Sequence, residues 1–219
     1  MEIRRVLEHD EWGELFSLVV VSLSLPQKLA CEVDALCVFT GQGEDIRVIQ
    51  PARNYWENRN TKNRFFLIPG YNEKERTWKK ITKEGLAGET FNMNRLGGVH
   101  VGPKMHTTKD QSDWAVGKIG ELGIKSLGIV STPFHLIRAY ATTLNSLNAA
   151  KVRIPVVPVP VYLAPSTVIP ETGTGAWDLF QGEAERIRMY RKKGDVISHE
   201  KFKEYMDWLW QQPILKDNV

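Results

Sequence analysis

A histidine and an arginine stand one helical turn apart in the segment STPFHLIR (131–138), directly after an apolar run. Pro133 suits the first position of a helix, and either hydroxyl residue before it suits the N-cap. His135 and Arg138 then share a face near the positive end of the helix dipole. A cation is unfavourable there unless an anion is bound. We therefore predict that Arg138 binds an anionic group, that Ser131 contacts the ligand, and that His135 is catalytic, moving a proton or donating a hydrogen bond.

A structural role for the same residues is the alternative. His135 can be hydrogen-bonded in the core, and Arg138 can pair with a carboxylate of a neighbouring helix. Further along the chain, Glu183 and Arg186 also fall one turn apart. That spacing fits a surface ion pair, which contributes little to stability.

A second polar segment, MHTTKDQ (105–111), follows another short apolar run. The spacing of Thr108 and Gln111 is that of a capping box, which satisfies the first N–H groups of a helix. The segment carries more polar groups than a cap requires, so we predict ligand contacts from His106, Thr107, Thr108 and Gln111. Asp110 is the second predicted catalytic residue, and it would orient His135 or a substrate hydroxyl.

Two glycines, Gly41 and Gly43, lie in the turn TGQGED (40–45) after the first apolar run. Glycines allow backbone amides to approach an anion or a sugar closely. The turn lacks the third glycine of a dinucleotide fingerprint and the lysine of a P-loop, so a tight turn without a ligand is an equal alternative. Glu73, after the next apolar run, is the predicted acidic contact to a ribose, unless its loop is simply solvated.

The elements that position these residues alternate between strand and helix. Apolar runs predict strands at 34–40, 64–68, 99–101 and 126–130, and a proline-interrupted edge strand at 152–161. Helical patterns lie at 74–86, 108–122 and 133–148, with two more at 176–193 and 198–212. This order predicts an α/β, Rossmann-like three-layer fold with a mostly parallel sheet and a C-terminal helical cap.

One domain is expected from a length of 219 residues. It divides into an N-terminal helix (1–33), a core (34–162) and a C-terminal loop with helices (163–219). The first helix would begin at an Asp10 cap, end near Ser24 and be buried against the sheet. Because Gly41, Thr108 and His135 all follow strands, we predict that they lie at one edge of the sheet.

The composition of the chain indicates which partners and cofactors to expect. The chain is 42% hydrophobic and 25% charged, and its net charge of +3 is spread along the sequence, so we expect no nucleic acid partner. Cys31 and Cys37 are too few for a disulfide framework or a structural zinc site, and we predict no metal. Their use favours a cytoplasmic protein. The apolar stretch 15–25 is too short to span a membrane.

Three segments together resemble a known family. They are FTGQG (39–43), TTKDQSDW (107–114) and, most specifically, VSTPFHLIRAY (130–140). They are similar in order and spacing to the YdcF/SanA/ElyC-like family of bacterial proteins over roughly residues 34–162, and the tail 183–196 is similar to a soluble subgroup. The chain departs from the family at Thr107, where asparagine is common, and at Asp110, where glutamate is common.

The resemblance implies a Rossmann-like fold with a pocket at the strand ends. One family member is thought to bind S-adenosylmethionine, and membrane-anchored members affect the cell envelope. Three functions follow. The first is an enzyme that binds and acts on a nucleotide-like or phosphorylated small molecule. The second is an S-adenosylmethionine-binding module without turnover, and the third an envelope-related interaction protein.

Overall fold

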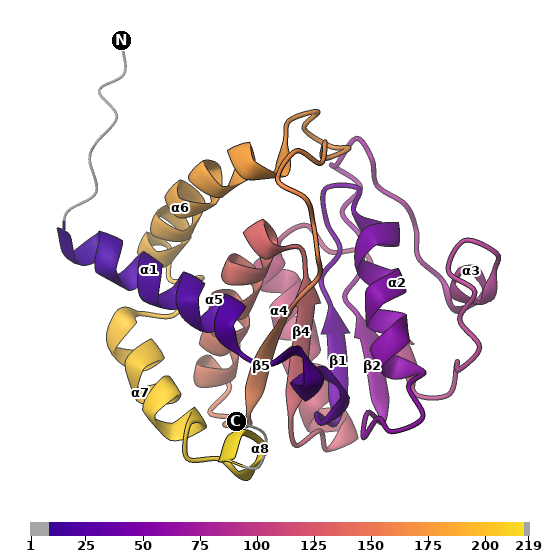
Figure 1. Ribbon diagram of the computed structural model, residues 1–219, viewed down its shortest axis with the longest axis horizontal. Helices are drawn as coiled ribbons and strands as arrows, with labels where there is room; N and C mark the ends of the chain where they lie inside the picture. The colour runs from indigo at the N-terminus through magenta and orange to yellow at the C-terminus, as the bar shows by residue number, and fades with distance from the viewer. Residues whose placement is uncertain (1–8, 217–219) are drawn as a thin grey trace.

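The structure is a computed structural model that describes residues 9–216, and its centre is a five-stranded sheet with helices on both sides (Figure 1). The strands are β1 (Ala35–Val38), β2 (Phe65–Ile68), β3 (Val99–Val101), β4 (Leu127–Ser131) and β5 (Val156–Pro160), in the order β3-β2-β1-β4-β5. Every neighbouring pair is parallel. The predicted Rossmann-like three-layer fold is confirmed.

Burial on both faces explains why the strands are apolar runs. Every residue of β1 and β4 is buried, as expected for central strands of a covered parallel sheet. β5 lies at an edge and contains Pro158 and Pro160, which an edge strand tolerates because one side of its backbone makes no ladder bonds. The predicted edge strand is present, but it is shorter than 152–161.

Helices complete the layers. They are α1 (His9–Ser24), the 3-10 helix η1 (Gln27–Cys31), α2 (Asp45–Trp56), α3 (Lys83–Ala87), α4 (Thr108–Leu122), α5 (Pro133–Ala149), α6 (Ala176–Lys192), α7 (His199–Leu209) and α8 (Pro213–Lys216). Figure 1 shows α2 on one face of the sheet and α4 and α5 on the other. Helix α6 packs against α5, so the predicted C-terminal cap is present.

The sequence prediction missed α2. Pro51 lies inside this helix, where proline removes a hydrogen-bond donor and normally argues against a helix. Four residues of α2 are nevertheless fully buried: Val48, Ile49, Ala52 and Trp56. Burial of this face stabilises α2 by more than the proline costs.

A helix predicted at 74–86 is absent, and only its last residues enter α3. The reason is a tertiary contact. The Glu171 carboxylate accepts hydrogen bonds from the backbone N–H of Arg76 (2.7 Å) and of Thr77 (2.8 Å). These amides therefore have a partner 94 or more residues away and do not enter a helical ladder.

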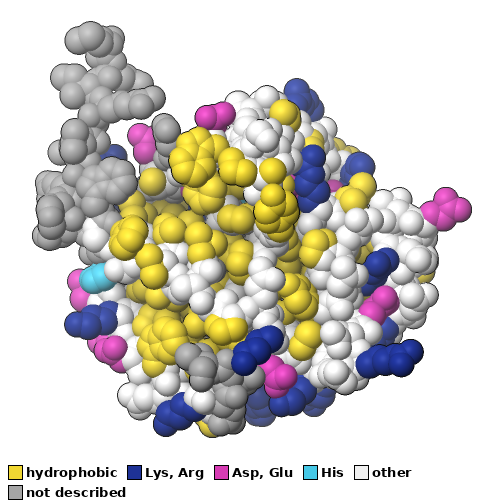
Figure 2. All heavy atoms as spheres, viewed as in Figure 1, with side chains coloured by type: hydrophobic (Ala, Val, Ile, Leu, Met, Phe, Trp, Pro, Cys, Tyr) yellow, Lys and Arg dark blue, Asp and Glu magenta, His cyan; other side chains and the backbone are white. Residues whose placement is uncertain are grey.

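Helix α1 lies against the sheet, as predicted, because it packs on the edge strand β5 and on α5. Asp10 does not cap it, since His9 and Asp10 both belong to the helix, and only one side of the helix is buried. Leu15 and Leu18 face β5 and α5, while Phe16 is 70% exposed. Figure 2 shows hydrophobic side chains gathered on this face of the molecule. Within residues 9–216, no helix is both long and apolar enough to cross a membrane.

Candidate functional site

A pocket of about 210 Å³ lies where the loops after β1, β2 and β3 meet the start of α5. Seven of the predicted site residues line it: Gly41, His106, Thr107, Thr108, Gln111, His135 and Arg138. The sheet order places β1 beside β4, where the connections diverge, and ligands of open α/β sheets bind at this point. The prediction that Gly41, Thr108 and His135 share one edge is therefore confirmed.

Three other predicted residues lie outside the pocket lining. Ser131 is buried, and its hydroxyl donates to the carbonyl of Phe39 (2.8 Å), which joins the ends of β4 and β1. Glu73 pairs with Lys104 on the surface. At Gly43, whose φ is 76°, a Cβ would come within 2.8 Å of the Thr77 hydroxyl, so glycine is needed there for loop packing.

Asp110 also lies outside the lining, because it caps α4. Its carboxylate accepts from the N–H of Thr107 (3.0 Å), and the Thr107 hydroxyl accepts from the N–H of Asp110 (3.0 Å). The capping box is therefore Thr107 with Asp110, not the predicted Thr108 with Gln111. Gln111 donates instead to the carbonyl of Gly70 (2.9 Å). The structure does not bring the Asp110 carboxylate to His135.

The cap leaves the Thr108 side chain free for Arg138. One terminal nitrogen of the Arg138 guanidinium donates to the Thr108 hydroxyl (2.6 Å). Its Nε and its other terminal nitrogen donate to the Glu183 carboxylate at 2.7 and 3.3 Å. The predicted structural alternative for Arg138, a carboxylate partner on a neighbouring helix, is thus present. A guanidinium has five N–H donors, so two remain for a ligand.

Glu183 is 1% exposed and is shared by two arginines. Besides Arg138, it accepts from Arg186 at 2.7 Å. Burial alone would raise the pKa of Glu183, but the two guanidiniums hold that pKa below its usual range. The sequence interpretation of Glu183 and Arg186 as a surface pair is therefore wrong. The three side chains together carry one net positive charge, and of the two guanidiniums only that of Arg138 lines the pocket.

His135 is 6% exposed and lies between Arg138 and the β1 loop. A Cβ on Gly41 would stand 3.2 Å from both Nδ1 and Cε1 of the His135 ring, so the ring packs against this glycine. Its Nε2 is buried without a hydrogen-bond partner among the described residues. An unpartnered buried polar atom costs about 1–3 kcal/mol, so the imidazole is held in this place at a cost to stability.

The dependence of the free energy of unfolding on pH should reveal the buried environment of His135. Burial, aided by Arg138, lowers the pKa of His135 to about 3, whereas an unfolded histidine has a pKa of about 6.5. As the pH falls, this histidine is therefore protonated in the unfolded chain before it is protonated in the folded one. The free energy of unfolding decreases as the pH drops from 6.5 toward 3. Between pH 7 and pH 5, the free energy of unfolding measured in urea should fall by about 2 kcal/mol more for the wild type than for His135→Gln. An equal loss in both proteins would contradict this environment, and His199→Gln on α7 is the control.

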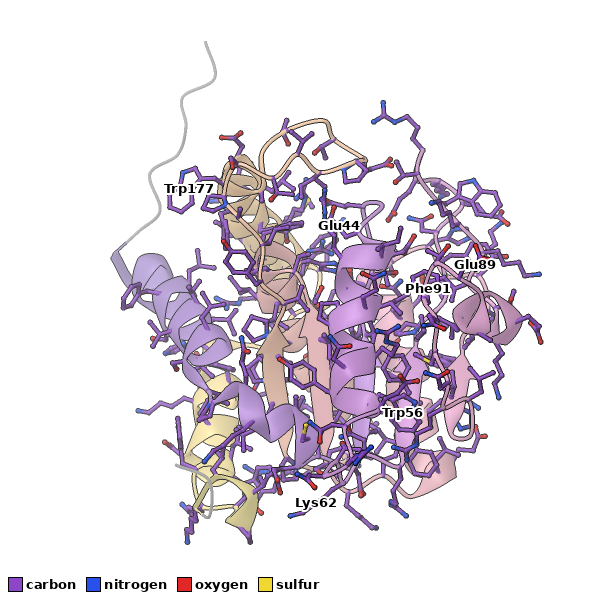
Figure 3. All side chains as sticks on the ribbon, turned by 45° about the vertical axis from the view of Figure 1, so that its right-hand side comes forward. Glu44, Trp56, Lys62, Glu89, Phe91 and Trp177 are labelled. Atoms are coloured by element: carbon purple, nitrogen blue, oxygen red, sulfur yellow. The ribbon has the colours of Figure 1, made fainter. Side chains whose placement is uncertain are left out.

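The β1 loop forms the next part of the wall. Gly41, Gln42 and Gly43 all have positive φ (108°, 55° and 76°). The N–H of Gln42 points at the carboxylate of Glu75, at 3.1 Å. An acidic side chain of the protein itself thus occupies one backbone amide of the turn that was predicted to approach an anion or a sugar. Figure 3 shows Glu44 at the end of α2 beside these loops and Trp56 at the far end.

Sequence reasoning missed several lining residues, among them Glu75, Thr142, Tyr190 and Asp195. Tyr190 and Asp195 come from α6 and the turn after it, and no local pattern connects them to the strand loops. The central carbon of the Arg138 guanidinium lies 5.8 Å from the centre of the Tyr190 ring. Among the described residues, no group of three or more His, Cys, Asp or Glu side chains could hold a metal ion.

Comparison with known proteins does not assign the chain to a family. No family model matches the chain, and no curated protein was found with a similar sequence. Membership of the YdcF/SanA/ElyC-like family therefore stays a prediction, and the function is argued from the pocket.

Proposed function

We propose that this pocket binds a small phosphorylated or otherwise anionic molecule. The observation that carries the proposal is the Arg138 guanidinium, held on the pocket wall by buried Glu183 with two N–H donors still unused. A guanidinium fork matches a phosphate or carboxylate, which can accept two N–H bonds at once. The Thr132 side chain makes no cap bond, so the positive start of α5 adds to this preference.

Binding is better supported than turnover. A general base normally has a second group that orients it, and here no hydrogen bond joins a described carboxylate to His135. Its low pKa also keeps His135 neutral at physiological pH, which suits a hydrogen bond to the ligand rather than a charge. If the protein is an enzyme, His135 is the residue we propose to accept the proton.

S-adenosylmethionine is the second candidate ligand. One observation favours it: an acidic residue, Glu75 in place of the predicted Glu73, stands after β2 beside the glycine loop. In Rossmann folds an acidic residue after β2 holds a ribose. The volume argues against the whole cofactor, because pockets for drug-sized ligands begin near about 300 Å³. An envelope-related interaction rests on the family resemblance alone.

Thermal unfolding in the presence of a ligand panel tests the proposal. The panel contains inorganic phosphate, ribose 5-phosphate, adenosine monophosphate and S-adenosylmethionine. A ligand at one hundred times its Kd stabilises by about 2.7 kcal/mol, which for a chain of this size raises Tm by roughly 5–10 °C. We expect a saturable rise with a phosphorylated compound. No rise with any phosphorylated compound would overturn the proposal, and product analysis on any hit decides whether turnover occurs.

A further inference from the structure

The wall of the pocket beside the β1 loop presents hydrogen-bond acceptors, unlike the wall at Arg138. The side-chain oxygen of Gln42 is buried and has no partner among the described residues. Glu75 uses one carboxylate oxygen to accept from the N–H of Gln42 at 3.1 Å. Both residues line the pocket. A ligand that carries hydrogen-bond donors would suit this wall.

Contacts give the order of groups along the pocket. Arg138 lies one helical turn after His135 on α5, and the His135 ring packs on Gly41. Gln42 follows Gly41, and its N–H leads to Glu75. The positive group and the acceptor group are therefore separated by the imidazole. A ligand that reaches both must carry an anion at one end and hydrogen-bond donors at the other.

Glu75 has no cation of its own. The structure records no ion pair for Glu75 within residues 9–216, although two other acidic residues nearby do pair with cations: Glu44 with Arg47 and Glu73 with Lys104. Burial raises the pKa of Glu75, and the charges of Glu171 and Asp45 raise it further. A partly buried carboxylate in such surroundings is stabilised by donors that reach it through the pocket.

We infer that Glu75 and Gln42 bind hydroxyl groups, so that the ligand is a phosphorylated sugar or polyol. The inference rests on the proposed anion site at Arg138. Hydroxyls suit this wall better than an ammonium group, because Gln42 is neutral and its amide can pair with a hydroxyl as acceptor or donor. A pentose phosphate also suits the volume of about 210 Å³ better than a dinucleotide does.

Calorimetric titration of two phosphates tests the inference. Ribose 5-phosphate carries hydroxyls, whereas tetrahydrofurfuryl phosphate has the same ring and phosphate without them. We expect the wild type to bind ribose 5-phosphate on the order of tenfold more tightly or better, as one or two hydrogen bonds to a charged group would give. Glu75→Gln keeps an acceptor for the Gln42 N–H, so it should fold, and it should bring the two affinities close together.

Glu73→Gln is the matched control, because Glu73 lies in the same loop and pairs with Lys104 outside the pocket. It should leave both affinities unchanged. If the wild type binds both phosphates equally, or Glu75→Gln matches the wild type, hydroxyl recognition is overturned while the anion site stands. If phosphoethanolamine binds more tightly than ribose 5-phosphate, this wall binds a cation instead. If the wild type binds none of the three, the proposed function falls together with the inference.

Discussion

Arg138→Ala should weaken binding of a phosphorylated ligand such as ribose 5-phosphate by about 1.5–3 kcal/mol, the value of a charged hydrogen bond. That corresponds to roughly a ten- to 150-fold rise in Kd. Arg138→Lys keeps the charge but loses the planar fork, so it should also weaken binding, although by less. Affinity is measured by calorimetry at a temperature well below the Tm of each variant, so that only folded protein is compared.

Arg186→Ala is the control that separates binding from stability. Arg186 shares Glu183 with Arg138 but does not line the pocket. Its loss should lower Tm and raise Kd at most a few-fold, through the missing charge alone. Both arginine variants should unfold more easily, because each removes a partner of Glu183. Unchanged affinity in folded Arg138→Ala would mean that Arg138 only holds α6 to α5.

Glu183→Ala should lower the free energy of unfolding by about 3–5 kcal/mol, because the largely buried guanidinium of Arg138 would lose its counter-ion. The Arg138 side chain is 12% exposed and that of Glu183 only 2%, so water cannot replace the lost partner. Urea unfolding at pH 7 measures the effect. The same cluster joins α6 to α5, and the loss of Glu183 should therefore also increase hydrogen exchange in α6.

Glu185→Ala controls for the loss of an acidic residue from the same helix. Glu185 is exposed two positions away, and a surface change of this kind stays within about 0.5 kcal/mol. If Glu183→Ala and Glu185→Ala lower the free energy of unfolding by similar amounts, the buried ion pairs of Glu183 are not a major source of stability. Glu183→Leu combined with Arg138→Met should recover much of the stability lost in Glu183→Ala, because well-packed apolar groups often replace a buried ion pair without loss.

Much of the fold could be predicted because buried parallel strands are continuous apolar runs. The run 127–130 is an example, since β4 is buried along its whole length. The helix starts at Thr108 and Pro133 also follow local rules and match α4 and α5. Where long-range contacts outweigh local preference, prediction fails. Helix α2 forms despite Pro51, and the amides of Arg76 and Thr77 bind Glu171 instead of forming a helix.

The candidate site, like the fold, could be predicted only where local sequence rules determine the structure. The location of Gly41, Thr108 and His135 follows from strand order, which the sequence encodes locally. The partner of Arg138 does not, because Glu183 is 45 residues away and its spacing to Arg186 is the same in a surface pair and in a buried one. Only the packing of α6 on α5 distinguishes them. Similarly, Glu73 and Glu75 follow the same strand, and the turn between them decides which one reaches the pocket.

The imidazole of His135 gives the most direct test of the anion pocket, because it has an unpartnered nitrogen beside Arg138. Its ring 15N signals can be assigned by comparison with His135→Gln and followed by NMR during titration with ribose 5-phosphate. We predict that they shift along a saturable curve with the Kd found by calorimetry, and that this shift is lost in Arg138→Ala. Saturable binding that leaves the His135 signals unmoved would place the ligand elsewhere and contradict the proposed site.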